Sequence, residues 1–567
     1  MNNTRTTYIN CKIFTSDTEL PLANAMTVEN GRISWIGDAN ELPTALGQTS
    51  NDANELAEIA ASDNISELPT VPGNIVDLGG HTVIPGLIDS HQHCLLMANL
   101  VKAIAALPPK IHDMDELAEA IREAERNLEE GRWIEGWGYD EGKLKEKRKP
   151  NRYDLDRGST ETPVVIVRAC QHIVSVNSKA LEIAGITRDT PDPEGGVIGR
   201  DAKGEPDGIL YENARNLVYK YMPKLTEEAS ADNLKVYGDV LASKGVTAIS
   251  DLGELTGLKY GHIFEKAIDL GFKTKVGAYF IWDFIKDDPE FDPAILGTGH
   301  GPVCDSNAET APPQILYPGI KLIGDGSVSG HTAWLDRPYP GTDDCGLPTC
   351  TAKDIEDAKA FAKNHQCQLS VHCMGTAAID RTIELLYKEK PWLQAPVPTF
   401  RTEHITMPSE TAMDRAAAAG IPFVTQPVFM FSEIESYLEN LGHDWTKTCY
   451  PVRTWLDKGV RVAFSTDAPA TAWAEPYDPF VNIQAAVTRR AWEGTDLGQD
   501  QKISIEEALR LYTAESGPMM GFRDIGILRK GFAADFVVLD EDILRVEEDK
   551  ISQVKVLGTY INGEKVF

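Results

Sequence analysis

The chain has 567 residues, of which 42% are hydrophobic and 25% charged, and its formal net charge at pH 7 is −31. This length exceeds the usual size of one domain, so we expect one large unit and at least one smaller module. The acidic balance argues against nucleic acid and against an anionic membrane surface as partners, because like charges repel each other.

The cysteines and the apolar runs bear on the compartment. Nine cysteines are scattered without a CxxC pair, which favours reduced thiols over a disulfide framework. Residues 1–11 lack the features of a signal peptide, and no apolar run approaches the ~18–20 residues of a membrane-spanning helix. We therefore expect a soluble cytoplasmic protein with a small-molecule substrate. A homodimer is compatible with base rates alone.

Short runs of alternating apolar and polar residues open the chain, as expected of small antiparallel strands. They cover residues 7–14, 25–28 and 31–37. Residues 47–72 are rich in Asn, Asp, Glu, Ser and Ala, and predict a solvated surface insertion. Strand character resumes at residues 75–85, so the same module continues beyond the insertion.

Apolar runs then alternate with helical patterns, which is typical of parallel βα units. Eight such runs suit an α/β fold, a closed (β/α)8 barrel of the TIM type, formed by residues 83–126 and 224–509. The runs cover residues 82–88, 246–251, 274–280, 319–324, 368–372, 398–404, 421–426 and 460–467.

One interval between these runs is too long for a single helix. Residues 127–223 contain an aromatic and glycine-rich segment at 133–139 and a strand-like run at 163–168. We expect an inserted subdomain that lies over the mouth of the barrel.

The end of the chain repeats the texture of its beginning. Residues 530–539 and 554–563 are again short strands and turns. We predict that residues 1–82 and 510–567 build one composite β-sandwich module. The alternative is two separate β appendages.

The strongest chemical signal is the segment PGLIDSHQH at residues 85–93. On an extended strand, residues i and i+2 face the same way, so His91 and His93 point together into the barrel. Active sites of such barrels lie at the carboxyl ends of the strands. Imidazole nitrogens bind zinc and similar ions, and an HxH pair in this place therefore predicts a metal site.

Three later strand ends supply matching groups, namely His372, His404 and Asp467. Each has a structural alternative. The two histidines could be hydrogen-bonded core residues, and Asp467 could cap the following helix. Their shared position at carboxyl strand ends favours a common site.

The chain as a whole resembles the amidohydrolase superfamily, and within it the YtcJ-like branch, amidohydrolase family 3, which includes N-substituted formamide deformylases. The resemblance runs nearly from end to end, and its motifs are specific in combination. They lie at residues 85–93, 133–140, 176–181, 185–193, 319–327, 371–372, 403–404, 465–467 and 531–540.

This resemblance implies a site for one or two divalent metal ions, with zinc expected. Its residues would be His91, His93, Lys321, His372, His404 and Asp467. Lys321 would be N-carboxylated and bridge two metals, since a plain ammonium beside two cations would be repelled. Asp467 would bind the first metal and act as general base for a metal-activated hydroxide.

Weaker candidates for substrate binding surround this set. Asp325 could support the site or only shape a turn, and His331 stands where related members usually carry Arg. His172 could reach the substrate, and it stands at a point of the chain where the family typically has Gly-His. Trp137 could form an aromatic wall, although aromatic packing in the core of the inserted subdomain is the favoured alternative.

The leading hypothesis is a metal-dependent amidohydrolase that cleaves an amide-type, non-peptide C–N bond, N-acyl, N-formyl or similar, in a small molecule. A lactonase, a deaminase or a carbamate hydrolase could use the same scaffold. A catalytically silent binding or regulatory relative is a third alternative, but the complete set of metal ligands favours catalysis.

Overall fold

A computed structural model describes residues 5–42, 74–129, 131–169, 172–253, 260–300 and 313–567. The insertion predicted at 47–72 lies outside these residues. The chain divides into two compact units. One contains Met1–Leu95, Leu234–Ala468 and Tyr477–Phe567, and the other contains Leu96–Asn233 and Pro469–Pro476.

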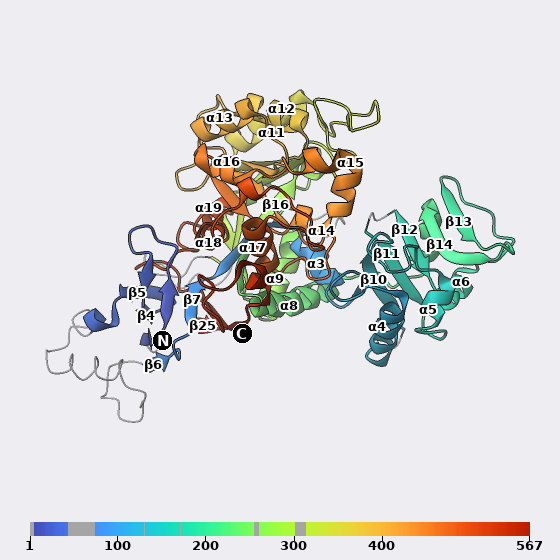
Figure 1. The fold of residues 1–567 in the computed structure, drawn as a ribbon, viewed down its shortest axis with the longest axis horizontal. Helices are drawn as coiled ribbons and strands as arrows, with labels where there is room; N and C mark the ends of the chain where they lie inside the picture. Colours follow the sequence, from blue (N-terminus) through green and yellow to red (C-terminus); the bar gives the residue numbers. More distant parts are fainter. Residues whose placement is uncertain (1–4, 43–73, 130, 170–171, 254–259, 301–312) are drawn as a thin grey trace. The chain divides into compact units, whose positions relative to one another are not determined.

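Eight parallel strands of the larger unit form one sheet that curls into a nearly closed barrel, which confirms the predicted fold class. The helices α11 (Ala352–Asn364), α12 (Thr376–Leu386) and α13 (Glu410–Ala419) alternate with its strands and lie side by side (Figure 1). The strands, in order, are β8 (Leu87–Gln92), β15 (Val246–Asp251), β16 (Lys275–Ile281), β18 (Ile315–Ile323), β19 (Gln368–Cys373), β20 (Phe400–His404), β21 (Phe423–Thr425) and β22 (Val462–Phe464).

Backbone hydrogen bonds join the segment after β22 to the end of β8. Asp467 N donates to His91 O at 2.7 Å, and His93 N donates to Ala468 O at 2.8 Å. The first and last strands of the barrel are therefore held together at the carboxyl end, where the predicted metal ligands lie.

The first predicted barrel run, residues 82–88, is wrong as a single strand. Residues Thr82–Pro85 form β7 in a different sheet, and the barrel strand β8 begins at Leu87. The chain changes sheets at Gly86, where a Cβ atom would lie 2.1 Å from the Thr247 hydroxyl oxygen. Only glycine permits this close approach, so an apolar run that is continuous in sequence serves two sheets.

Both chain ends build one module of two facing sheets, which rules out two separate appendages. The N-terminal sheet has the order β5-β4-β1-β6, and the mixed sheet has the order β25-β24-β23-β7-β2-β3. Their strands are β1 (Arg5–Ile9), β2 (Lys12–Phe14), β3 (Leu22–Ala23), β4 (Ala25–Glu29), β5 (Arg32–Gly37), β6 (Asn74–Asp77), β7, β23 (Phe536–Leu539), β24 (Val556–Ile561) and β25 (Glu564–Lys565).

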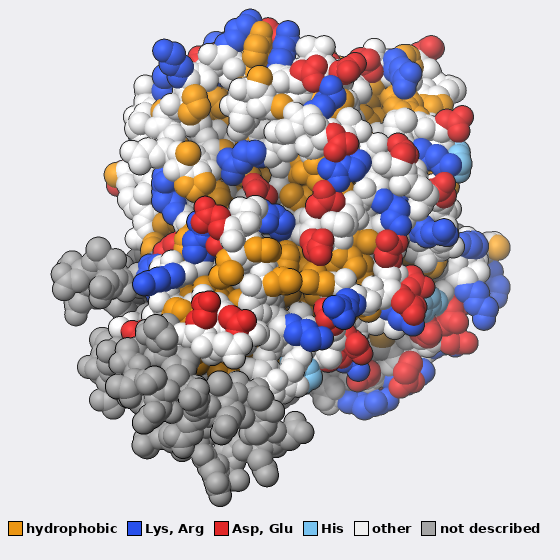
Figure 2. Space-filling view, turned by 60° about the vertical axis from the view of Figure 1, so that its left-hand side comes forward, with side chains coloured by type: hydrophobic (Ala, Val, Ile, Leu, Met, Phe, Trp, Pro, Cys, Tyr) orange, Lys and Arg blue, Asp and Glu red, His pale blue; other side chains and the backbone are white. Residues whose placement is uncertain are grey.

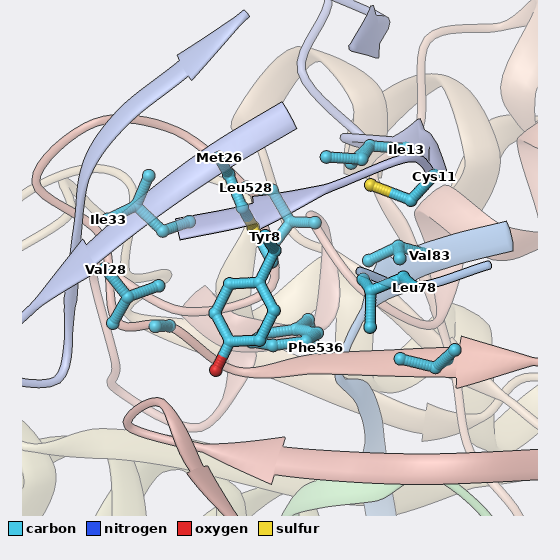
Figure 3. Close-up of a cluster of buried hydrophobic side chains, with 12 residues drawn as sticks. Tyr8, Cys11, Ile13, Met26, Val28, Ile33, Leu78, Val83, Leu528 and Phe536 are labelled. Carbon is cyan, nitrogen blue, oxygen red and sulfur yellow. The ribbon is translucent and has the colours of Figure 1, made fainter. Parts of the chain in front are cut away.

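The two sheets share a hydrophobic core (Figure 3). Tyr8 of β1 packs edge-on against Phe536 of β23, with ring centroids 5.0 Å apart. Met26 and Val83, from opposite sheets, are fully buried in the same cluster. Burial of apolar area between sheets is the main stabilising contribution in such a sandwich.

The second unit contains a six-stranded sheet with the order β13-β14-β12-β11-β10-β9. This unit spans more of the chain than the insertion expected at 127–223. It includes helix α4 (Met114–Arg126), which buries Leu117 and Ile121 in the core of the unit. The position of this unit over the barrel mouth stays a prediction. The strands are β9 (Ile104–Ala105), β10 (Ile134–Tyr139), β11 (Val164–Arg168), β12 (Ile173–Val176), β13 (Gly196–Arg200) and β14 (Pro206–Glu212).

The surface carries charges of both signs. Acidic and basic side chains are interspersed on the face drawn in Figure 2. Many are paired, as Lys458 is with Asp414 at 2.7 Å, although exposed pairs of this kind add little stability. Within the described part of the chain, no helix combines the length and the apolar character needed to cross a bilayer.

Candidate metal centre

His91 and His93 lie at the carboxyl end of β8, and both rings approach one carboxylate oxygen. The distances to Asp467 Oδ1 are 3.4 Å from His91 Nε2 and 3.6 Å from His93 Nε2. One ligand atom of each of these three residues lies within 4.8 Å of the other two. Two imidazoles and a carboxylate at this spacing are a donor set for zinc or a similar divalent ion.

Asp467 reaches this cluster because the chain turns sharply after β22. Its backbone φ is 56°, in the left-handed region that Asp adopts more readily than most residues. The preceding residue, Thr466, is anchored by Asp89 of β8, whose Oδ1 accepts from Thr466 N at 3.0 Å and whose Oδ2 accepts from the Thr466 hydroxyl. The position of the Asp467 carboxylate is thus fixed by contacts with β8, the first strand of the barrel.

His404 and His372 bring two further imidazoles to the same place. The His404 ring centroid lies 4.7 Å from that of His91 and 4.3 Å from that of His372. The Glu403 side chain points into the barrel, so regular strand alternation would turn the next side chain, that of His404, to the outer face. The left-handed backbone of His404, with φ of 75°, redirects its ring.

Lys321 lies near the end of β18 and is 1% exposed. Burial lowers the pKa of Lys321 to about 8, against the opposing effect of the Glu403 and Asp467 carboxylates. A lysine in an apolar environment is the type that loses its charge and reacts as a neutral amine. This position fits the predicted role of Lys321 between the two pairs of histidines.

The four imidazoles are neutral and oriented by their neighbours. Burial lowers the pKa of His93 to about 4 and of His372 to about 3, and it holds the pKa of His91 and of His404 well below the ordinary range. His93 Nδ1 donates to Gly253 O at 3.2 Å, and His372 Nε2 donates to Gly326 O at 2.9 Å. Each ring therefore keeps its other nitrogen as a lone-pair donor.

Three supporting residues were missed by the sequence reasoning. Glu403 accepts from His91 Nδ1 at 2.7 Å, and Gln426 Oε1 lies 3.0 Å from His404 Nδ1. Asp89 is the third, through its hold on the segment before Asp467. Their signal was present in the motifs that contain the predicted ligands, since Asp89 and Glu403 are buried polar residues two and one positions from a predicted metal ligand.

Two buried polar atoms in the cluster have no hydrogen-bond partner among the described residues. They are Lys321 Nζ and Asp467 Oδ1. Orphaned buried polar atoms are rare and costly, so they indicate a ligand that the polypeptide does not supply. Together with neutral imidazoles, they fit a divalent cation.

The weaker candidates are placed as follows. Asp325 is buried and accepts from the amides of Trp334, Met374 and Gly375, each at 2.9 Å; its Oδ1 lies 3.6 Å from His372 Nε2. Burial raises the pKa of Asp325 to about 6. It fixes the segment that directly follows β19, the strand on which His372 lies.

Of the other three candidates, His331 and His172 have partners of their own. His331 stacks on Tyr339, with ring centroids 3.9 Å apart. Trp137 and His172 belong to the second unit, where Trp137 is 4% exposed and His172 Nδ1 lies 2.9 Å from Glu212. The substrate-binding role of these residues stays a prediction.

The chain matches a family model described as "Amidohydrolase family" over residues 74–567. It is similar to the YtcJ protein of Bacillus subtilis (strain 168), with 28% identity over 87% of this chain and 90% of the relative. It is also similar to N-substituted formamide deformylase of Arthrobacter pascens, with 27% identity over 98% of this chain and 97% of the relative.

A solved structure shares the architecture. The crystal structure of an uncharacterized metal-dependent hydrolase from Pyrococcus furiosus aligns with a TM-score of 0.68 and 26% identity. The alignment covers 95% of this chain and all of that one, so both the barrel and the remaining sheets have counterparts there.

Proposed function

Because the chain belongs to the amidohydrolase family, we propose that it is a metal-dependent hydrolase that cleaves an amide-type C–N bond, N-acyl, N-formyl or similar, in a small molecule. The observation that carries the proposal is a buried cluster of four neutral imidazoles, Lys321 and Asp467, in which Lys321 Nζ and Asp467 Oδ1 have no hydrogen-bond partner among the described residues. The similarity to a formamide deformylase adds weight to a formyl or acyl group as the part removed.

His91, His93 and Asp467 would hold one divalent ion, for which zinc suits the donor set, and Lys321, His372 and His404 would hold a second. When bound, such an ion lowers the pKa of water toward about 7 and polarises a carbonyl oxygen. The remaining steps fall to side chains of this protein.

We assign the proton transfer to Asp467. Its Oδ1 faces the His91 and His93 rings, while its Oδ2 lies 3.9 Å from His404 Nδ1. The carboxylate accepts a proton from the water that attacks the carbonyl carbon, and it returns this proton to the amine nitrogen as the C–N bond breaks. Buried imidazoles on both sides restrict the carboxylate to this place.

Lys321 supplies a neutral amine that can become a bridging ligand. Its free amine attacks carbon dioxide, a new N–C bond forms, and one proton is released to solvent, which leaves an anionic carbamate. The Lys321 amine is buried and has no hydrogen-bond partner among the described residues, so a neighbouring cation would stabilise the carbamate.

The first experiment joins metal analysis to a substrate screen. Protein purified without chelator should contain one or two divalent metals per chain and hydrolyse members of a panel of N-formyl, N-acyl, ureido and lactone compounds. Hydrolysis of the lactones or ureas alone would overturn the amide assignment. Absence of metal together with absence of turnover would overturn the hydrolase proposal.

A substitution tests the base. Asp467→Asn should retain the fold and the metal, but turnover should fall by at least about 100-fold, the usual contribution of a positioned proton acceptor. The matched control is Asp535→Asn, which changes another buried carboxylate that pairs with Lys275 at the start of β16, away from the carboxyl ends of the strands. Wild-type turnover in Asp467→Asn would remove this residue from the mechanism.

A further inference from the structure

The orientation of His91 depends on a buried carboxylate. Glu403 Oε2 lies 2.7 Å from His91 Nδ1, and both side chains are at most 1% exposed. A carboxylate only accepts hydrogen bonds, so the proton of the neutral ring must be on Nδ1. The lone pair is then on Nε2, the atom that faces Asp467.

A carboxylate buried this deeply stays ionised only if a cation compensates its charge. Arg401 provides this cation from two positions earlier on β20. Its Nε bonds Glu403 Oε1 at 2.5 Å, and its Nη2 bonds Oε2 at 3.1 Å, while Ser370 Oγ donates to Oε1 at 2.7 Å. Arg401 and Ser370 thus donate three hydrogen bonds to the Glu403 carboxylate, and His91 Nδ1 donates the fourth.

Arg401 is itself fixed by several strands across the barrel interior. Its Nη1 donates to Ser250 Oγ at 3.3 Å, to Tyr279 OH at 3.2 Å and to Met519 O at 3.0 Å, and its Nη2 donates to Ser90 O. These contacts use the planar fork of a guanidinium, which a lysine ammonium cannot reproduce. The cation is fully buried and cannot leave the carboxylate.

We propose that Arg401 and Glu403 are positioning residues for the metal centre, which set the tautomer and the direction of His91 through a fixed Arg401–Glu403–His91 chain. The inference rests on the proposed metal-dependent function and deepens it. Neither residue touches the substrate in this account, because both act through the imidazole of His91.

Glu403→Gln separates this role from simple charge removal. Arg401 donates to both carboxylate oxygens, so the glutamine amide has one oxygen to offer to the guanidinium and must turn its NH2 group toward His91. That NH2 donates, so His91 Nδ1 has to accept and the ring proton moves to Nε2. The nitrogen that should bind the metal then has no lone pair.

The test measures Co²⁺ binding by the full-length, metal-depleted protein, using competition with a chelator of known affinity and the visible absorption of bound Co²⁺. We expect Glu403→Gln to bind Co²⁺ about 10–100-fold more weakly, the range found when supporting partners of metal ligands are lost, and to shift the absorption bands. Asp535→Asn is the matched control, since it also replaces a buried carboxylate paired with a buried cation, and it should keep the wild-type affinity and spectrum.

A folded Glu403→Gln variant with wild-type affinity and spectrum would overturn the inference while leaving the proposed function intact. If this variant does not fold, Arg401→Lys provides the second test, because it keeps a positive charge beside Glu403 but loses the paired geometry. Arg401→Lys should weaken Co²⁺ binding in the same direction, and an unchanged affinity would overturn the inference. A wild-type protein that binds neither Co²⁺ nor zinc would overturn both proposals.

Discussion

The buried Lys321 should destabilise the metal-free protein. Lowering the pKa of Lys321 from 10.5 to about 8 raises the neutral fraction at pH 7 about 300-fold, from about 0.03% to about 10%. The same displacement corresponds to about 3 kcal/mol, because one pKa unit is about 1.4 kcal/mol. Since the pKa is depressed on folding, the unfolded chain binds more protons between pH 8 and 10.5, and the free energy of unfolding rises with pH in that window.

Lys321→Met tests this reasoning, because methionine fills a similar space without a charge. The metal-free variant should unfold at a higher denaturant concentration than the metal-free wild type at pH 7, with an upper limit of about 3 kcal/mol, and it should lose the stability increase between pH 8 and 10.5. Denaturant unfolding after chelation, followed by circular dichroism at several pH values, measures both effects. A variant that is less stable than the wild type at pH 7 would refute the argument.

The same variant should lose function. Without an amine at this position no carbamate can form, so the second metal should be absent by elemental analysis. Wild-type protein incubated with ¹³C-labelled bicarbonate should show a carbamate resonance that Lys321→Met lacks. Stability gained together with metal lost is the trade-off expected of a strained functional site.

Two further substitutions probe the frame around the site. Asp89→Asn weakens the anchor on Thr466 and should lower turnover about 10–100-fold while the barrel stays folded, which kinetics and circular dichroism together would check; unchanged kinetics would mean that Asp467 is placed without this anchor. Asp535→Asn leaves the buried Lys275 without its anionic partner and should cost about 3–5 kcal/mol in unfolding without affecting metal content, and a loss below 1 kcal/mol would contradict the buried-pair argument.

Much of the fold and most of the candidate ligand set could be predicted from the sequence. Parallel strands in a barrel end at one rim, so polar residues at the ends of separate apolar runs, such as His91, His372 and Asp467, must converge wherever the runs are strands. The one misplaced strand, at 82–88, shows the limit of this reasoning. Hydrophobicity marks buried extended chain, but it does not say in which sheet the chain is buried, and the close approach of Gly86 to Thr247 is a tertiary contact.

The amino-acid order by itself predicted the barrel, the terminal sandwich and five of the candidate ligands, because each follows from local periodicity and from where polar residues interrupt it. Lys321 joined the candidate set only through the resemblance to the amidohydrolase family. Tertiary structure decided which neighbours orient those ligands. Arg401 gathers partners from β8, β15 and β16, and His404 faces the site only because its backbone enters the left-handed region. The contacts of Arg401 join residues more than 100 positions apart, and no periodic pattern along the chain encodes them.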